Sequence, residues 1–298
     1  MKKIFVIGSA TMDMVVKAEK HPLPGETLLG GNFFMNAGGK GANQAVAVAR
    51  LGGNLTFVAK VGNDVFGKQI IEGFRKENMN TDFVFVDEKN PSGAALIMVN
   101  ATGENCIVVA PGSNGNLLMS DIDKVKNISE AEIILMQLEI PMDTIQTVAR
   151  NAKSNNQKVI LNPAPAQHLS DELLNGLFLV TPNETEAAIL TGIEVTDDAS
   201  AESAANYLLN KGVENVIITL GKQGAYFKNK GRSLKIKSPE VIALDTTAAG
   251  DTFSGALTVA LTEGMDWKHA IEFACKAASI SVTRLGAQAS VPYRKEIV

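Results

Sequence analysis

Only two cysteines and three histidines occur among the 298 residues of this chain. Cys106 and Cys275 show no framework spacing, which argues against a disulfide scaffold and favours a reducing compartment. His21, His168 and His269 stand isolated from one another, so zinc chemistry is not expected. A G-x-S-x-G sequence is also missing, and an α/β-hydrolase would therefore lack its nucleophile.

Strong net charge and long apolar runs are missing as well. The formal net charge is −4 and no run of Lys or Arg exceeds two residues, so nucleic acid and anionic membrane surfaces are not expected as partners. No apolar stretch is long enough to span a bilayer. Residues 1–10 carry two lysines and a short apolar run, which we interpret as a buried first strand and not as a signal peptide. These features predict a soluble, cytoplasmic protein.

What the sequence does contain is a regular alternation of short β-branched runs with helical patterns. Apolar runs separated by helices indicate a mainly parallel sheet covered on both faces, and 45% hydrophobic residues suffice for one large α/β domain. The strand-like runs are 2–9, 55–62, 82–86, 132–139, 158–165, 177–183 and 215–221, and the helical patterns include 38–52, 66–78, 142–153, 199–212 and 267–282.

Two segments break this rhythm with strands that no helix separates. They are 11–36 and 91–111, and the turn "NATGEN" between two β-rich arms predicts a hairpin in the second. We expect these pieces to form a small separate β layer, a lid, at the edge of the sheet. The predicted core domain then consists of 1–10, 37–90 and 112–298.

The stretch "DTTAAGDTFSGAL" at 245–257 carries the strongest chemical signal. A β-like run at 233–244 leads into it, and Ala248, Ala249, Gly250 and Asp251 precede or open a helix. Small residues let the N–H groups of a first helical turn approach an anion closely, where the helix dipole favours negative charge. Asp251 would then be placed as a base for an attacking hydroxyl. An ordinary N-cap aspartate is the alternative.

A second glycine-rich turn, "NAGGKGANQAVAVARLG", runs into a helix at 36–52. It is not a P-loop, because Lys40 is followed by Gly41, and it fails the G-x-G-x-x-G pattern at Gln44. Lys40 and Asn43 can nevertheless hydrogen-bond a polyhydroxy ligand. A loop ordered only for packing explains the glycines equally well.

Two further turns follow strands. In "TPNETEA", Asn183 and Glu186 share a helix face and could hold Mg²⁺ through water, although a capping box accounts for the same pair. "ITLGKQGAYF" suits either a nucleotide loop or an ordinary hairpin. Two anion-friendly turns and a potential Mg²⁺ pair together favour phosphoryl transfer.

Seven stretches in this order resemble the ribokinase family of sugar kinases, and the set as a whole points to its pentose kinases. They are "GGKGANQAVA", "LMQLE", "NPAPA", "TPNETEA", "ITLG", "AAGDTFSGAL" and "VTRLGAQASVP". The resemblance implies a three-layer α/β/α sandwich with a β-sheet lid. It also implies ATP-dependent phosphorylation of D-ribose at the 5-hydroxyl, with Mg²⁺ and an activating monovalent cation, K⁺. A homodimer formed through the lid is expected.

The same resemblance assigns roles to individual positions. Asp251 would be the catalytic base, and the backbone of Ala248, Ala249, Gly250 and Asp251 the anion hole. The sugar-contacting positions are Thr11, Asp13, Gly39, Lys40, Asn43 and Glu139. Those near the nucleotide are Asn183, Thr219, Gly221, Gly224, Gly250 and Cys275, with Glu186 near Mg²⁺. The K⁺ loop would contain Asp245, Thr247, Ser281, Arg284, Gly286 and Ser290, several of them acting through backbone carbonyls.

Two departures from the family pattern bear on specificity. Thr11 stands where asparagine is usual, and the loss of an amide could shift preference toward 2-deoxyribose or another small furanose. Cys275 replaces a histidine near the adenine, which affects the expected base selectivity. A catalytically silent pentose sensor is the non-enzymatic alternative, although its signature would have been the loss of Asp251.

Overall fold

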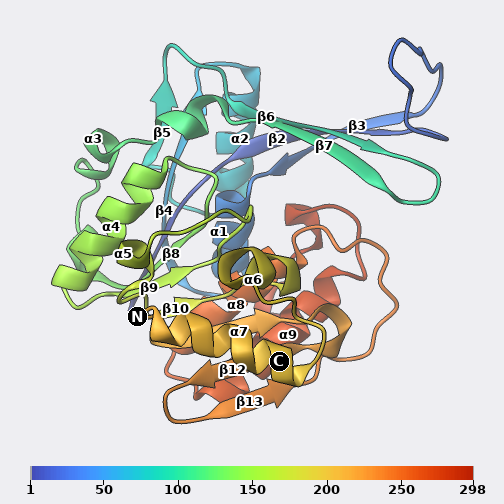
Figure 1. The fold of residues 1–298 in the computed structure, drawn as a ribbon. Helices are drawn as coiled ribbons and strands as arrows, with labels where there is room; N and C mark the ends of the chain where they lie inside the picture. The colour runs from blue at the N-terminus through green and yellow to red at the C-terminus, as the bar shows by residue number, and fades with distance from the viewer. Residues whose placement is uncertain (1, 298) are drawn as a thin grey trace.

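The computed structural model describes residues 2–297, so Met1 and Val298, the ends of the predicted core domain, lie outside the described residues. Its main feature is a nine-stranded sheet with the order β13-β12-β11-β10-β9-β8-β1-β4-β5 (Figure 1). All neighbours from β5 to β11 are parallel, and β12 and β13 extend the sheet as antiparallel strands. This confirms the predicted mainly parallel sheet.

The elements follow the predicted alternation closely. The strands of the large sheet are β1 (Lys3–Ile7), β4 (Asn54–Gly62), β5 (Val84–Asp87), β8 (Ala131–Met136), β9 (Lys158–Leu161), β10 (Leu179–Val180), β11 (Asn215–Thr219), β12 (Ala225–Asn229) and β13 (Ser233–Ile236). The helices are α1 (Lys40–Arg50), α2 (Val65–Lys76), α3 (Met119–Ile122), α4 (Met142–Ser154), α5 (Asp171–Leu174), α6 (Glu184–Thr191), α7 (Asp198–Asn210), α8 (Ala249–Thr262) and α9 (Trp267–Ser281). Short 3₁₀ turns are η1 (Gly112–Asn116), η2 (Ile128–Glu130), η3 (Gly221–Gln223), η4 (Gln288–Ser290) and η5 (Arg294–Glu296).

Helices cover both faces of the large sheet, each over its own apolar core. In β1, Ile4 and Val6 point into the core under α1, α2, α8 and α9, whereas Phe5 and Ile7 point into the core under α3 to α7. The alternation of side chains along a strand explains why both sets must be apolar. The result is the predicted three-layer sandwich.

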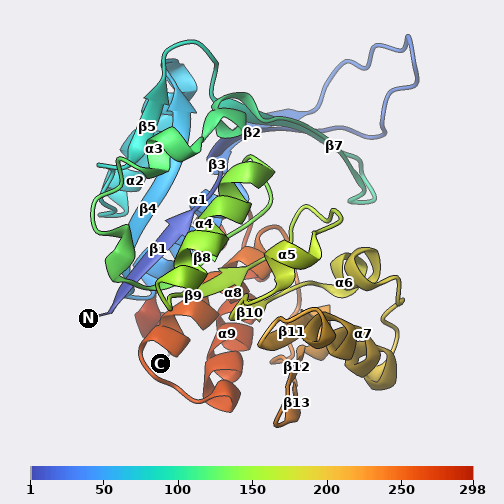
Figure 2. The same ribbon diagram turned by 60° about the vertical axis from the view of Figure 1, so that its left-hand side comes forward.

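A separate four-stranded sheet, called the lid sheet below, has the order β3-β2-β6-β7. Its strands are β2 (Thr11–Lys17), β3 (Asn32–Gly38), β6 (Gly93–Val99) and β7 (Asn105–Ala110), and the predicted hairpin joins β6 to β7. Figure 2 shows these strands projecting from one edge of the sandwich. The division of the chain into two domains at the predicted boundaries remains a prediction.

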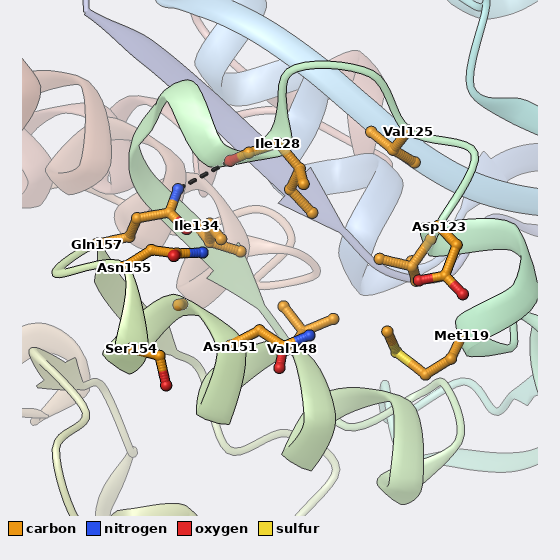
Figure 3. Close-up of a pocket in the computed structure, with 12 residues that line it drawn as sticks. Met119, Asp123, Val125, Ile128, Ile134, Val148, Asn151, Ser154, Asn155 and Gln157 are labelled. Atoms are coloured by element: carbon orange, nitrogen blue, oxygen red, sulfur yellow. Dashed lines mark hydrogen bonds between the residues drawn. The ribbon is translucent and has the colours of Figure 1, made fainter.

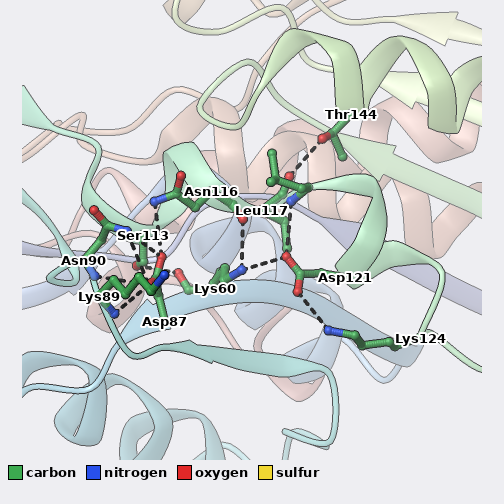
Figure 4. Close-up of polar contacts among 11 residues, drawn as sticks. Lys60, Asp87, Lys89, Asn90, Ser113, Asn116, Leu117, Asp121, Lys124 and Thr144 are labelled. Carbon is green, nitrogen blue, oxygen red and sulfur yellow. Dashed lines mark hydrogen bonds and ion pairs between the residues drawn. The ribbon is translucent and has the colours of Figure 1, made fainter.

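Polar contacts hold the segments that lead to and from the lid sheet. Lys60 on β4 donates to the Asn116 carbonyl at 3.0 Å and to Asp121 at 2.8 Å, and Asp87 accepts from Asn116 at 3.1 Å (Figure 4). The buried Asn114 side chain bonds both the N–H and the carbonyl of Ala10 at 2.9 Å. These contacts fix η1 and the start of β2 against the core.

The β-like run predicted at 233–244 is wrong beyond Ile236, where β13 ends. Pro239 has no N–H to donate to a neighbouring strand, and residues 237–244 form no strand. The chain therefore leaves the sheet well before it reaches Asp245. Among the helices within 2–297, none is long and apolar enough to cross a membrane.

Helices α1 and α8 approach each other closely at Gly255. A Cβ added there would lie 2.6 Å from the Ala47 Cβ and 2.8 Å from the Gln44 carbonyl oxygen. Both are held in place by packed helices, so neither can yield easily.

We expect Gly255→Ala to lower the free energy of unfolding by about 1–3 kcal/mol, because the added methyl overpacks this contact. The matched control is Gly73→Ala in α2, where an added Cβ meets nothing within 4 Å. That variant should be stabilised by about 0.4–1 kcal/mol through its less flexible unfolded chain. Urea unfolding of both variants measures the difference. Equal effects of the two substitutions would contradict the proposed close approach.

Candidate active site

The predicted site residues gather at the carboxyl ends of the parallel strands, where open α/β sheets bind ligands. Two neighbouring cavities lie there, of about 800 Å³ and about 200 Å³. Lys40, Ala248 and Asp251 line both. The larger cavity is roofed by Ala95, Ile97, Ile107 and Val109 of the lid sheet.

Asp251 lies in the first turn of α8 and is buried. Its two carboxylate oxygens accept from the side-chain amides of Asn43 and Gln44, each at 2.9 Å. Helix α8 begins after Ala248, which adopts a left-handed conformation with φ of 59° and makes no side-chain cap. The alternative in which Asp251 is the N-cap is therefore wrong.

The start of α8 also offers backbone donors to the smaller cavity. Within residues 2–297, no acceptor is found for the N–H groups of Gly250 and Asp251, as is usual for a first helical turn. Ala248, Ala249 and Gly250 line this cavity beside Asp251. Their arrangement can hold an anion next to the buried carboxylate.

The larger cavity is polar on the side of α1. Asp13 on β2, Asn43 and Glu139 all line it, and the buried Oδ1 of Asn43 has no hydrogen-bond partner among the described residues. Thr11 donates to Asp13 at 2.9 Å, and the Lys40 N–H donates to Glu139 at 2.9 Å. These acceptors can bind the hydroxyl groups of a small ligand.

The glycines before α1 are required by close contacts. A Cβ on Gly38 would lie 2.1 Å from an Asp13 carboxylate oxygen, and one on Gly41 would lie 2.4 Å from the Ser9 N–H nitrogen. Gly39 adopts φ of 89°, which favours glycine. The turn therefore packs the start of α1 against both the end of β1 and the lid sheet. The glycines are needed for this packing and also leave space for the Asp13 carboxylate at the cavity.

Lys40 and the carboxyl groups around it shift one another's pKa values. Burial alone would lower the pKa of Lys40, but Asp251, Glu139, Glu186 and Asp13 together raise it above its ordinary value. Burial raises the pKa of Asp13, and Glu139 and Asp251 raise it further against the hydrogen bond from Thr11. Burial likewise raises the pKa of Glu186. The carboxylates thus keep the half-buried Lys40 protonated, and a protonated lysine can bind a phosphoryl group.

The residues expected near the nucleotide are only partly assembled at the smaller cavity. Asn183, Glu186 and Thr219 line it. Asn183 and Glu186 form the capping box of α6, with bonds of 2.8 and 2.9 Å. Gly221 and Gly224 belong to a hairpin joining β11 to β12. Cys275 is buried in the core on α9, where burial raises the pKa of its thiol to about 12.

The residues expected around K⁺ come from two loops that touch. Both Leu244 and Asp245 donate their N–H groups to the Val282 carbonyl, at 2.7 and 3.1 Å. The Asp245 carboxylate accepts from the N–H groups of Thr247 and Gly286, each at 2.9 Å. Of the other expected residues, Ser281 and Ser290 direct their hydroxyls to nearby carbonyls, and Arg284 pairs with Glu296.

Four polar residues of the site were not predicted. Ser9 donates to Glu139, Asn114 holds Ala10, and Gln44 and Asn162 share a hydrogen bond of 3.0 Å beside Asp251. Asn162 follows β9 in "NPAPA" and Gln44 follows Asn43, so the motifs contained both. Nothing in the sequence distinguishes Gln44 and Asn162 from ordinary core or loop residues.

A further hollow of about 350 Å³, lined by apolar and polar side chains, lies apart from these residues, between α3, η2 and α4 (Figure 3). Met119, Val125, Ile134 and Val148 line it, and Gln157 at its rim donates to the Ile128 carbonyl at 2.8 Å. It contains none of the predicted site residues.

The fold and the two joined cavities define an enzyme that transfers an anionic group to a small polar ligand. The chain belongs to the pfkB family of carbohydrate kinases, which matches residues 1–294. It is 46% identical to the ribokinase of Haemophilus influenzae, over 99% of this chain and 97% of that protein. It is 35% identical to the deoxyribokinase of Salmonella typhi, over 97% and 95%. The structure of Arabidopsis thaliana ribokinase complexed with ribose and ATP is similar, with a TM-score of 0.92 at 34% identity, covering 99% and 97% of the two chains.

The raised pKa of Asp13 makes a prediction about stability. A carboxyl whose pKa is higher in the folded than in the unfolded chain contributes stability at low pH and loses it as the pH rises through the folded pKa. Asp13→Asn removes the ionisable carboxyl, so the variant does not lose this stability as the pH rises. We therefore expect its gain in unfolding free energy over the wild type to be larger at about pH 8 than at about pH 4.

Asp197→Asn provides a control of opposite sign, because Ser200 lowers the pKa of Asp197 at the start of α7. That variant should lose stability relative to the wild type as the pH rises from about 2.5 to about 5, because the lowered pKa lies below the ordinary value of 3.8. Urea unfolding at about pH 2.5, 4 and 8 tests the pair. A gain for Asp13→Asn that is independent of pH would contradict the assigned shift.

Proposed function

We propose that this chain phosphorylates D-ribose at its 5-hydroxyl, using ATP. The observation that carries the proposal is the position of Asp251 between the two cavities, held by two amides and adjoining the start of α8. The similarity to ribokinases over nearly the full chain supports ribose as the sugar.

The proposed roles follow from the two cavities. Ribose occupies the larger one, where Asp13, Asn43 and Glu139 accept or donate hydrogen bonds to its hydroxyl groups. The triphosphate of ATP reaches the smaller one. Asp251 accepts the proton of the 5-hydroxyl as that oxygen attacks the γ-phosphorus, and ADP leaves. The N–H groups of Gly250 and Asp251, with Lys40, stabilise the charge on the transferring phosphoryl group. The Ala249 N–H, which was expected to take part, already donates to the Thr246 carbonyl at 3.3 Å.

Metal ions are expected to support this chemistry. Within residues 2–297, no cluster of three or more His, Cys, Asp or Glu could hold a metal directly. One Glu186 oxygen accepts from Asn183, and its carboxylate lines the smaller cavity, which fits Mg²⁺ held through water. Mg²⁺ would neutralise charge on the phosphates. The Asp245 and Gly286 loops fit a K⁺ site, because the Asp245 carboxylate orders both loops and backbone carbonyl oxygens are suitable ligands for K⁺.

A 2-deoxyribose kinase is the second candidate. Thr11 donates its hydroxyl proton to Asp13, so only its oxygen remains to contact a sugar hydroxyl. The 35% identity to a deoxyribokinase supports keeping this alternative. We also propose a cytoplasmic location, because the chain has one exposed and one buried cysteine, both free.

The decisive experiment measures ADP release from ATP and Mg²⁺, with and without K⁺, across ribose, 2-deoxyribose, fructose and adenosine. We expect the highest kcat/KM with ribose and an increase with K⁺. Asp251→Asn should lower kcat by about 10²–10⁴-fold, the usual contribution of a general base. Near-normal turnover by that variant would overturn the role of Asp251. Ribose binding without any ADP release in the wild type would instead favour a pentose sensor.

Thr11→Asn serves as the specificity control in the same assay. If Thr11 sets the preference, this substitution raises the ratio of kcat/KM for ribose over 2-deoxyribose. A wild type that prefers 2-deoxyribose keeps the proposed chemistry and replaces the proposed sugar.

We also propose a homodimer formed through the lid sheet. Met35, Met14, Leu96 and Val108 are register neighbours across all four strands. Val108 is 69% exposed and Leu96 is 57% exposed, and Phe33 nearby is 61% exposed. An apolar patch of this kind on a projecting sheet supports a protein–protein contact. A second copy of the chain would cover it.

Leu96→Asp combined with Val108→Asp should give a monomer, because two carboxylates would be buried without partners. Val65→Asp, at an equally exposed apolar position on α2, is the control and should remain dimeric. Sedimentation equilibrium at micromolar concentration measures all three proteins. A monomeric wild type, or a dimeric double variant, would refute this interface.

A further inference from the structure

A chain of buried amide side chains adjoins Asp251. Gln137 follows β8, Gln44 lies on α1 and Asn162 follows β9. Gln137 and Gln44 are fully buried, and Asn162 is nearly so. Neither Gln44 nor Gln137 lines either of the two cavities, so neither can contact a ligand bound there.

The hydrogen bonds along this chain run in one direction. Gln137 donates to the Gln44 side-chain oxygen. The Gln44 side-chain nitrogen then donates to Asp251 Oδ1 at 2.9 Å and to Asn162 Oδ1 at 3.0 Å, which uses both of its hydrogens. Asn162 in turn donates to the Thr181 carbonyl at 3.1 Å. Rotating the Gln44 amide by 180° would aim its oxygen at the Asp251 carboxylate, and Gln137 opposes this by occupying that oxygen.

The backbone lies close to two residues of this chain, Gln137 and Gln44. A Cβ on Gly8 would lie 2.1 Å from the Gln137 side-chain oxygen, and one on Gly255 would lie 2.8 Å from the Gln44 carbonyl. Glycine at these two places lets the end of β1 approach the Gln137 side chain and lets α8 approach the backbone of α1. The direction of the Gln44 donor is set by its acceptors on Asp251 and Asn162 and by the bond from Gln137.

We propose that Gln44 is a positioning residue for phosphoryl transfer: it fixes the orientation of the Asp251 carboxylate toward the sugar hydroxyl. The inference rests on the proposed function, in which Asp251 is the base. Asn43 binds the other Asp251 oxygen but also lines the sugar cavity, so its loss affects binding as well. Gln44 touches Asp251 without touching a ligand. Losing the Gln44 amide should therefore lower kcat and leave KM nearly unchanged.

Replacing Gln44 by methionine keeps the volume and removes the donor. Losing a hydrogen bond to a charged group should lower kcat by about 10–100-fold. The KM values for sugar and ATP should change less than about threefold. The sugar used is whichever the wild type turns over best. In an Asp251→Asn background, the same substitution should change the residual kcat less than about threefold, because Gln44 acts through the Asp251 carboxylate.

The matched control is Gln157→Met, which also removes an amide donor to two backbone carbonyls, but beside the separate hollow between α3 and α4. Its kcat should stay at the wild-type value. If Gln44→Met does not fold, Gln44→Leu also lacks any donor and is expected to lower kcat in the same way. A Gln44 effect of equal size in both Asp251 backgrounds, or one that appears in KM alone, would overturn the proposal.

Urea unfolding of four proteins separates this inference from the proposed function. They are the wild type, Gln44→Met, Asp251→Asn and the double variant. If the wild type releases no ADP with any sugar, the proposed function fails. The Gln44–Asp251 coupling is then still read from unfolding, where the two substitutions should be non-additive. Additive unfolding effects would show that Gln44 does not hold Asp251.

Discussion

A buried carboxylate must be paired with donors, and in this protein that requirement brings the start of α1 to the start of α8. Asp251 is buried on α8, and its donors Asn43 and Gln44 lie on α1. An unpaired charge there would cost several kcal/mol. The two helices must therefore pack closely, which Gly255 permits. The placement of Asp251 and the packing of one whole face of the sheet thus depend on the same contact.

The lid sheet is tied to this centre by charge and by close packing. Asp13 is carried on β2, yet it lies near enough to Lys40, Glu139 and Asp251 for each to affect its pKa. Gly38 at the end of β3 leaves space for its carboxylate. Because the lid sheet carries Asp13, the larger cavity is complete only when the strands of that sheet are in place. The polar contacts of Asn114 with Ala10 hold the start of β2 there.

Much of the fold and of the candidate site could be predicted from local patterns. Apolar runs and helical periods placed the strands and helices of the sandwich, and "NATGEN" placed the lid hairpin, because each signal depends on neighbouring residues only. The strand predicted at 233–244 was wrong after Ile236, since β-branched residues alone do not supply a pairing partner. In the sequence, Gln44 is notable only because it breaks a glycine pattern. Its role depends on a carboxylate 207 residues further along the chain.

The sequence by itself determined which chemical groups are present and where helices can begin: Asp251 in a small-residue turn, and Lys40 and Asn43 after glycines. It also determined that the sheet is buried on both faces. Only the tertiary structure decided that Asp251 receives hydrogen bonds from two amides and does not cap its own helix. It also showed the hydrogen bond between the Asp245 and Gly286 loops, which the family resemblance had grouped but no local pattern indicated. These outcomes depend on which strand ends meet at one edge of the sheet, and strand order is a property of the whole chain and not of any one motif.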